Sequence, residues 1–469
     1  MSYMKIKLAK QAHAEMVRGV FRLFAGRKPT LKELEKFVAS GASRDVVKAY
    51  AVANGLKDVN SSVSSSTQPY IFENGIRPRA SSSDPPGVMF RAHWHMPGNG
   101  LCDAYRRLAR ALHFTGTKVR LEGYRTQYPR WFSNENVATS EIRREVQDLL
   151  DTQVHEVARI NAFAYFTADG TTVPFMSRVV MRDEDRLSGY EDRTIFYTML
   201  EMYNCWPLET VPLLNRAREL WVPCSANVQA CVRSGVMPEK VVRVPVPYFE
   251  DDPRLALVER KRAAGVPHLY HIGSIEPRKD QGSLLRCFLL AIKPGDAILR
   301  IKGRQANAVA LARIRTCLLE EPEVRAAGWN ASAFDKYVQL IAEEWSEQQI
   351  TDLHAWGDVY ICASHGEGWN MPARDAKLAG NRMVHVASGG SEDFAGLHDL
   401  TIPVTRTGPS NIPGASWWCF DYDKVTEQIR QSVYDFRDTH TRDVDLTEQR
   451  ADVVGKQMLS RLRNLGASV

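Results

Sequence analysis

The stretch DVYICASHGEGWNMPARDAKLAG, residues 358–380, has the pattern of a strand, a loop and a helix in succession. Its first part, residues 358–364, is a continuous apolar run, which is typical of a parallel strand buried on both faces. The loop that follows places Glu367 between two glycines, so its backbone can approach a ligand closely. Pro372 suits the first turn of the next helix, and Gly380 suits its end. The stretch predicts an α/β fold with a ligand-facing glycine loop.

A second acidic residue, Asp375, follows Glu367 by eight positions, and we expect it in the first turn of that helix. A carboxylate can accept hydrogen bonds from two hydroxyls at once, as vicinal diols present them. Two carboxylates at this spacing fit two diols, one from a sugar and one from a ribose. Taken alone, Asp375 is better explained by the helix dipole and Glu367 by a solvated loop; the combination favours a ligand. A further glycine loop, residues 387–396, is either a plain turn or another source of N–H groups.

A similar unit occurs earlier, in GSIEPRKDQG, residues 273–282. A strand ends at its glycine, and a helix is predicted to begin near Gln281. Arg278 and Lys279 lie in the loop between them, beside the unpaired N–H groups and positive dipole end of that helix. Ligands of open α/β sheets bind beyond the carboxyl ends of the strands. The loop therefore predicts a diphosphate site that needs no metal.

Apolar runs separated by helical patterns occur in two series, which predict two doubly wound, Rossmann-like domains. The first series comprises residues 88–94, 117–123, 160–168, 193–200 and 220–225. The second comprises residues 268–275, 297–303, 336–343, 358–364 and 382–388. The length of 469 residues is also too great for one ordinary core.

The composition predicts three further parts around these domains. Helical spacing of apolar residues predicts a small module, and a serine- and proline-rich stretch predicts a linker. The predicted parts are a helical module (1–56), a linker (57–86), an acceptor domain (87–245), a donor domain (246–435) and a C-terminal helix (436–469). The proline-rich and acidic residues 242–255 are the expected hinge.

Composition and net charge indicate a soluble protein that binds an anionic ligand. The net charge is +6, which is too weak to indicate nucleic acid by itself. No apolar run approaches the roughly 20 residues needed to span a bilayer, and the N-terminus lacks a signal-peptide core, so we expect a cytoplasmic location. The eight cysteines form no CxxC pair, so neither zinc nor a disulfide framework is expected.

The two loops together, GSIEPRKD and then SHGEGWNMPARDAKLAG about ninety residues later, resemble the C-terminal domain of retaining GT-B glycosyltransferases of the family-four type (glycosyl transferases group 1). In that family basic loop residues bind the donor diphosphate, and an E-x7-E pair contacts the transferred sugar and the ribose. The resemblance implies that Arg278 and Lys279 hold the diphosphate, Glu367 the sugar and Asp375 the ribose. It further implies donor contacts from Gly273, Ser274, Gly366, Gly368, Trp369 and Asn370.

Two departures from the family pattern stand out. The family often has arginine directly after the loop glycine, where this chain has Ser274, so Arg278 is expected to replace that charge. Asp375 stands where glutamate is usual, and its shorter reach affects the ribose contact.

The first domain resembles the same family at residues 93–121, where a glycine loop joins the first strand and helix. The matching cleft positions are Gly98, Asn99 and Gly100. Glu201 and Asp169 follow strand ends and are acceptor-side candidates, although a surface or helix-start role is the simpler explanation for each. The remaining cleft candidates are His93, His95 and His365.

The resemblance implies transfer of a sugar from a nucleotide-diphosphate sugar to an acceptor hydroxyl, with no cofactor and no metal. The expected acceptor is a glycan or a lipid-linked saccharide, with peripheral membrane contact. Three alternatives stay open: a phosphorylase or epimerase on the same scaffold, a non-catalytic sugar-nucleotide-binding protein, and a transferase acting on nucleic acid, as in phage-type DNA glucosylation. In the last case, basic residues of the predicted module 1–56 would bind the nucleic acid.

Overall fold

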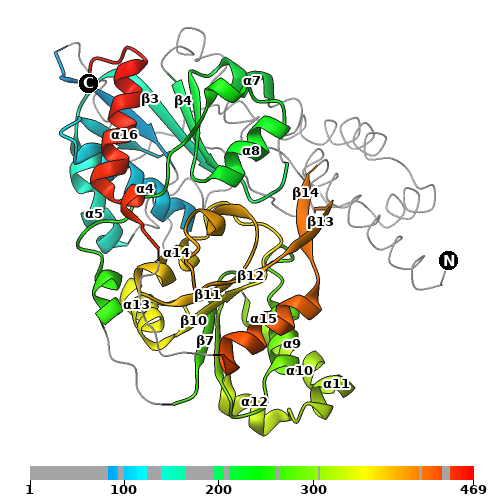
Figure 1. Cartoon of the computed structure of the whole chain (residues 1–469). Coiled ribbons are helices and arrows are strands. Elements are labelled where there is room, and N and C mark those ends of the chain that lie inside the picture. Colours follow the sequence, from blue (N-terminus) through cyan, green and yellow to red (C-terminus); the bar gives the residue numbers. More distant parts are fainter. Residues whose placement is uncertain are drawn as a thin grey trace, which may run out of the picture. The chain divides into compact units, whose positions relative to one another are not determined.

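The computed structural model (Figure 1) describes residues 83–92, 94, 100–123, 139–164, 194–204, 211–259, 265–304, 307–410, 415–435 and 444–469. The predicted helical module (1–56) and most of the predicted linker (57–86) lie outside these residues. So do the cleft candidates His93, His95, Gly98, Asn99 and Asp169.

Within the described residues, the first domain contains a six-stranded parallel sheet in the order β2-β1-β3-β4-β5-β6. Its strands are β1 (Pro86–Arg91), β2 (Val119–Glu122), β3 (His155–Ala164), β4 (Thr194–Met199), β5 (Glu219–Val222) and β6 (Val241–Arg243). The associated helices are α4 (Gly100–His113), α5 (Ser140–Asp151), α7 (Val211–Arg216) and α8 (Ser225–Arg233). All six side chains of β4 are buried, as expected for a parallel strand covered on both faces.

The second domain contains, again within the described residues, a six-stranded sheet in the order β12-β11-β10-β7-β8-β9. Its strands are β7 (His268–Ile272), β8 (Ile298–Lys302), β9 (Val338–Ile341), β10 (Val359–Cys362), β11 (Arg382–Val386) and β12 (Leu400–Ile402). Numbered from β7, this is the 3-2-1-4-5-6 order of a doubly wound fold, and it reverses between β7 and β10. Ligands of such folds bind beyond the carboxyl ends of the two strands that meet there.

Helices cover the second sheet on both faces, and their apolar residues join those of the strands in two separate core clusters. They are α9 (Gln281–Ala291), α10 (Ala308–Glu320), α11 (Pro322–Ala326), α12 (Ala331–Tyr337), α13 (Glu347–Trp356), α14 (Met371–Leu378) and α15 (Tyr422–Tyr434). A connector, residues 244–259, joins the two domains and includes the 3-10 helix η4 (Pro253–Glu259).

A hairpin of β13 (Val404–Pro409) and β14 (Ser416–Phe420) stands outside both parallel sheets. It belongs to the second domain but touches the first, because the Tyr203 backbone N–H donates to the Ser416 carbonyl at 2.9 Å. The Ser416 N–H donates in turn to Asn204 Oδ1 at 3.0 Å. This hairpin was not predicted from the sequence.

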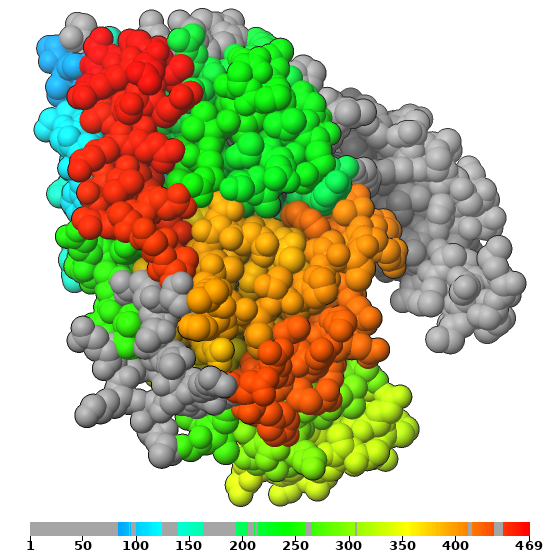
Figure 2. All heavy atoms as spheres, viewed as in Figure 1, coloured from blue at the N-terminus to red at the C-terminus, as the bar shows by residue number. Residues whose placement is uncertain are grey.

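The last helix, α16 (Ala451–Asn464), returns to the first domain and packs on α4 (Figure 1), and it lies at the surface of the molecule (Figure 2). Val454, Met458 and Leu462 are buried in the same core as the apolar face of α4. The two backbones are so close at Gly455 that an added Cβ would lie 2.2 Å from the Ala111 carbonyl oxygen. No helix among the described residues is both long and apolar enough to cross a membrane.

Candidate active site

The loops that follow β7 and β10 bring three predicted residues together at the switch point of the second sheet. Lys279 Nζ lies 3.1 Å from Glu367 Oε1, and Arg278 Nη1 lies 3.3 Å from the same oxygen. Arg278 also donates to the Gly366 carbonyl. The side chains of all three residues are largely buried. The structure therefore brings the basic loop and the glycine-flanked acid together.

The two cations determine the charge state of Glu367. Burial raises the pKa of this carboxyl, but the ammonium of Lys279 and the guanidinium of Arg278 more than offset it, so the net shift is downward. Glu367 is thus an anion held by two cations in a poorly solvated site. A sugar hydroxyl near Glu367 would meet a strong hydrogen-bond acceptor.

Glu201, from the end of β4 in the first domain, completes this cluster. Its Oε1 lies 2.9 Å from Arg278 Nη2, so Arg278 contacts carboxylates of both domains. Burial raises the pKa of Glu201, Arg278 lowers it, and the nearby Glu367 raises it; the net shift is upward. Of the two acceptor-side carboxylates, Glu201 is the one the structure describes, and it faces the donor-side residues.

Glycines let the loops of the cluster approach one another. An added Cβ on Gly366 would lie 2.0 Å from the Glu201 carbonyl oxygen, and one on Gly368 would lie 3.0 Å from Met199 Cβ. Gly389, at the start of η6 (Gly389–Asp393), has a φ of +70° and lies against the Glu367 carbonyl. This glycine loop, which the sequence left open as a plain turn or a source of N–H groups, packs directly on the acidic loop.

Two helix starts fix the positions of these loops. Asp280 caps α9 with φ +43°, and its side chain accepts from the Ser283 N–H at 3.4 Å. Asn370 precedes α14 with φ +64°, and its Nδ2 donates to Ser391 Oγ at 3.0 Å. Both predicted helix starts, near Gln281 and just before Pro372, are confirmed.

The remaining donor-side residues lie in or under the same loops. An added Cβ on Gly273 would lie 3.0 Å from Lys279 Cδ, so this glycine leaves room for the lysine side chain. The Ser274 carbonyl accepts from Gln281 Nε2 at 2.7 Å. Trp369 is buried against Phe394. In the first domain, Gly100 begins α4 close to Met371, the first residue of α14.

His271 was not among the predicted site residues, yet it lies beneath the cluster. Its ring is fully buried, and Nδ1 lies 2.9 Å from the Ile361 carbonyl. Burial and then the nearby Lys279 lower the pKa of His271 to about 4. The signal in the sequence was a histidine within the apolar run of a predicted buried strand.

His365, a predicted cleft residue, is held by aromatic and polar neighbours. Its ring stacks on Phe420 of the hairpin at a centroid distance of 4.8 Å, and Nδ1 lies 2.8 Å from the Trp418 carbonyl. Burial lowers the pKa of His365, but the hydrogen bonds with Asp280 and Trp418 raise it overall. The arrangement links the hairpin to the start of α9.

Asp375 lies in a different cluster from Glu367. It is the fifth residue of α14, so its predicted place in the first turn is wrong. Its Oδ1 lies 2.9 Å from Arg374 Nε, and its Oδ2 lies 2.8 Å from Arg254 Nη1 of the connector. The structure therefore brings Arg278, Lys279, Glu367 and Glu201 together and places Asp375 with a second set of arginines. Arg254 could not be linked to this set by a local motif, because 121 positions separate it from Asp375.

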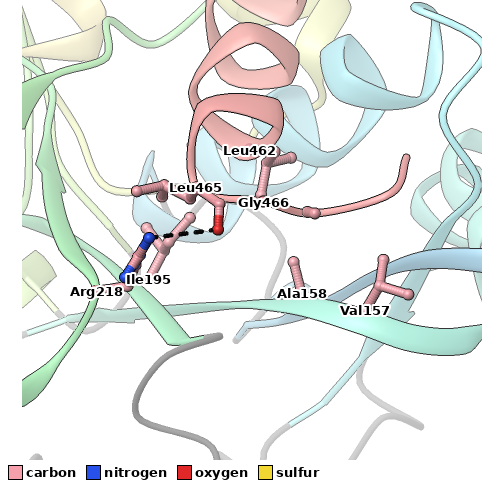
Figure 3. A pocket seen from close by; sticks show the side chains of 8 residues that line it. Val157, Ala158, Ile195, Arg218, Leu462, Leu465 and Gly466 are labelled. Atoms are coloured by element: carbon pink, nitrogen blue, oxygen red, sulfur yellow. Dashed lines mark hydrogen bonds between the residues drawn. The ribbon is translucent and has the colours of Figure 1, made fainter.

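A cavity of about 130 Å³ lies away from this cluster, between the end of α16 and the amino-terminal ends of β3 and β4 (Figure 3). Arg218 is on its wall and donates to the Leu465 carbonyl at 3.4 Å. The cavity lies at the opposite end of the strands from Glu201 and does not belong to the candidate active site. Its lining comprises Val157, Ala158, Ile195, Arg218, Leu462, Leu465, Gly466 and Ala467.

No protein-family model matches the sequence, and no curated protein matches it. Solved structures do match. A sucrose-phosphate synthase from Thermosynechococcus elongatus has a TM-score of 0.55 at 13% identity, covering 82% of this chain and 100% of that one. The trehalose-6-phosphate synthase OtsA has a TM-score of 0.51 at 11% identity, with coverages of 80% and 99%. Anabaena HepE, in complex with UDP and glucose, has a TM-score of 0.50 at 12% identity, with coverages of 81% and 99%.

These likenesses, together with the two parallel six-stranded sheets, show that the described chain has the GT-B fold. The predicted fold class, two facing Rossmann-like domains, is confirmed. The identities are so low that the likeness concerns the fold alone.

Proposed function

We propose that this protein is a retaining glycosyltransferase that moves a sugar from a nucleotide-diphosphate sugar to a hydroxyl of a glycan or lipid-linked saccharide. The observation that carries the proposal is the cluster of Arg278, Lys279 and Glu367 at the switch point of the second sheet, with Glu201 of the first domain against it. The GT-B fold and the resemblance of both loops to the family-four type support the same function.

Arg278 and Lys279 are the proposed diphosphate ligands. Both are largely buried cations, and the amino end of α9 lies directly behind them. In the present arrangement three carboxylates, Glu367, Glu201 and the more exposed Glu276, balance their charge. A diphosphate would therefore compete with Glu201 for Arg278, and we propose that the donor displaces Glu201 from this contact.

The proposed reaction takes place on one face of the sugar and uses no protein nucleophile. The bond between the anomeric carbon and the diphosphate oxygen breaks while the acceptor oxygen bonds to the same carbon. The acceptor proton passes to an oxygen of the departing diphosphate. Negative charge grows on that diphosphate in the transition state, where the preorganised cations Arg278 and Lys279 stabilise it most.

Glu201 is the proposed acceptor-side group. Once the diphosphate has taken over Arg278, the carboxylate of Glu201 is available to accept a hydrogen bond from the incoming hydroxyl. Glu367, in contrast, stays ionised beside Lys279 and is the proposed partner of the donor sugar hydroxyls.

The close approach of the two domains implies that the donor enters when they separate. The backbone of Gly366 touches that of Glu201, which leaves no room between these two loops. Opening about the connector, residues 244–259, would expose the cluster, and closing would align the acceptor and exclude water.

A thermal-shift screen of nucleotide sugars tests the proposal. UDP-glucose is the first probe because a solved structure of HepE, which has this fold, contains UDP and glucose. A ligand at about 100 times its dissociation constant adds roughly 2.7 kcal/mol of stability, which is readily measured as a rise in melting temperature. Absence of a shift with any of the UDP-, GDP-, ADP- or dTDP-sugars would exclude the function.

Assays of donor turnover separate the rival functions on the same scaffold. A transferase consumes the donor faster when an acceptor is added, an epimerase converts the donor alone, and a binding protein does neither. A glycan panel and a DNA panel then identify the acceptor class. Binding to DNA would show the steep salt dependence of phosphate contacts.

A further inference from the structure

A buried chain of alternating charges runs from the first domain through the connector into the second. It begins on α4, where Arg107 Nε lies 2.9 Å from Asp103 Oδ2. Arg107 Nη1 is 3.7 Å from Asp252 Oδ2 in the connector. Arg254 then contacts Asp252 through Nε at 2.7 Å and through Nη2 at 2.8 Å, and contacts Asp375 of α14 through Nη1 at 2.8 Å. We call these five residues the charge chain.

The charge chain is cooperative because its inner members are out of water. The side chains of Arg107, Asp252, Arg254 and Asp375 are each at most 8% exposed. Removing one member would leave a neighbour as a buried, unpaired charge, which costs far more than the pair contributes to stability. Loss of any one member should therefore destabilise the whole charge chain.

Arg374 closes the second-domain end of the charge chain. It is fully buried, and its Nη1 donates to the Val246 carbonyl of the connector at 3.3 Å while its Nε donates to Asp375 Oδ1. Both carboxylate oxygens of Asp375 therefore accept from arginines: Arg254 belongs to the connector, and Arg374 donates to the connector backbone. The resemblance, in contrast, implies that Asp375 contacts the donor ribose.

We propose that Asp375 is a positioning residue that anchors the charge chain, and that the charge chain sets the position of α14 relative to α4. The two helices begin at neighbouring points, because an added Cβ on Gly100 would lie 3.7 Å from Met371 Cγ. The loop with Glu367 leads into α14, and the predicted glycine loop of the first domain leads into α4. A shift of either helix would separate the two sides of the site.

The effect on catalysis rests on the proposed function, but the charge chain itself does not, so the test begins with a measurement that needs no substrate. Hydrogen exchange in the full-length protein is compared between the parent and Asp375→Asn. We expect amide exchange in α4, which belongs to the other domain, to accelerate at least tenfold. Lys377→Met is the matched control, since Lys377 lies on the same helix and is equally buried but pairs with Asp399 inside the second domain. It should leave α4 exchange unchanged.

Arg254→Lys provides a second variant in case Asp375→Asn does not fold. Lysine keeps the charge but lacks the planar fork that reaches Asp252 and Asp375 together. We expect a milder acceleration of α4 exchange and a lower melting temperature. If neither variant changes α4 exchange beyond the control, the charge chain does not couple the domains and the inference is wrong.

Kinetics with the donor found by thermal shift then distinguish a positioning residue from a ribose ligand. A positioning role predicts that Asp375→Asn lowers kcat at least tenfold with little change in donor affinity. It also predicts that Asp375→Glu, the residue usual in the family, does not improve donor affinity, because the longer side chain disturbs the contact with Arg254. A ribose ligand would show the opposite: weaker donor binding in Asp375→Asn, and restored or tighter binding in Asp375→Glu.

Discussion

At the scale of single residues, Lys279 offers the most direct test of the diphosphate site. Its ammonium is a largely buried cation 3.1 Å from Glu367, and in the proposed reaction it stabilises the departing diphosphate. Lys279→Ala should lower turnover by about two to four orders of magnitude, as loss of a major electrostatic group does. Lys293→Ala is the control, because Lys293 is exposed on the same domain. Near-normal turnover of Lys279→Ala would remove the diphosphate assignment.

Glu367→Gln keeps the shape of the side chain but removes its charge. The proposed contact with sugar hydroxyls then weakens, whereas the cations that hold the diphosphate remain. We expect transfer to be largely abolished while the free nucleoside diphosphate still binds, as isothermal calorimetry would measure. Loss of nucleotide binding in this variant would instead show that Glu367 acts mainly by ordering Arg278 and Lys279.

His271 predicts a pH dependence of stability. Its pKa is lowered from 6.5 to about 4 in the folded protein, so between these values the unfolded chain binds a proton that the folded chain does not. Stability is therefore full above pH 6.5 and falls as the pH drops toward 4, by roughly 3 kcal/mol in total. The free energy of unfolding, measured with denaturant at several pH values, should depend less steeply on pH for His271→Asn than for the parent. If the free energy of unfolding depends on pH equally in the two proteins, His271 is not the source of the pH dependence.

At the scale of helices and strands, the sequence predicted those strands that contain a continuous apolar run. Each of the ten predicted strand segments overlaps a strand of the structure, because buried parallel strands leave continuous apolar runs. The three-residue strands β6 and β12 are too short to leave such a run. The hairpin strand β13 is mostly exposed and polar, so it has no apolar signal at all.

Among single positions, Arg278, Lys279 and Glu367 were predictable because each lies in a loop that follows a strand end at the switch point. The partners of Asp375 were not, since they come from the connector and no local pattern encodes that contact.

The packing of α16 on α4 predicts an unusual response to a helix-favouring substitution. Glycine inside a helix normally costs up to about 1 kcal/mol relative to alanine, so Gly→Ala is expected to stabilise. At Gly455 the added methyl group would lie 2.2 Å from the Ala111 carbonyl oxygen, which forces the two helices apart. Gly455→Ala should therefore lower the melting temperature. The control Ser460→Ala, at an exposed position of the same helix, should leave it unchanged or raise it.

At the scale of the whole two-domain unit, the contact between the domains is built from backbone as much as from side chains. Cys224 Sγ of the first domain lies 3.1 Å from the Gly368 carbonyl of the second. Asp393 of the second domain accepts from the Ser225 N–H at the start of α8 and pairs with Arg243. Such contacts depend on how two folded domains meet, and therefore local sequence patterns do not predict them.

Gly366 allows this contact to be tested by one substitution. A methyl group there would lie 2.0 Å from the Glu201 carbonyl oxygen, so Gly366→Ala should prevent the two loops from closing while each domain stays folded. Because closure aligns the acceptor with the donor, kcat should fall at least tenfold, whereas nucleoside diphosphate binding to the second domain alone should persist. Hydrogen exchange should accelerate at residues 199–204, where the loop faces Gly366. Gly265→Ala is the control, since an added Cβ there meets nothing within 4 Å. Unchanged exchange and turnover in Gly366→Ala would mean that catalysis does not require the closed arrangement.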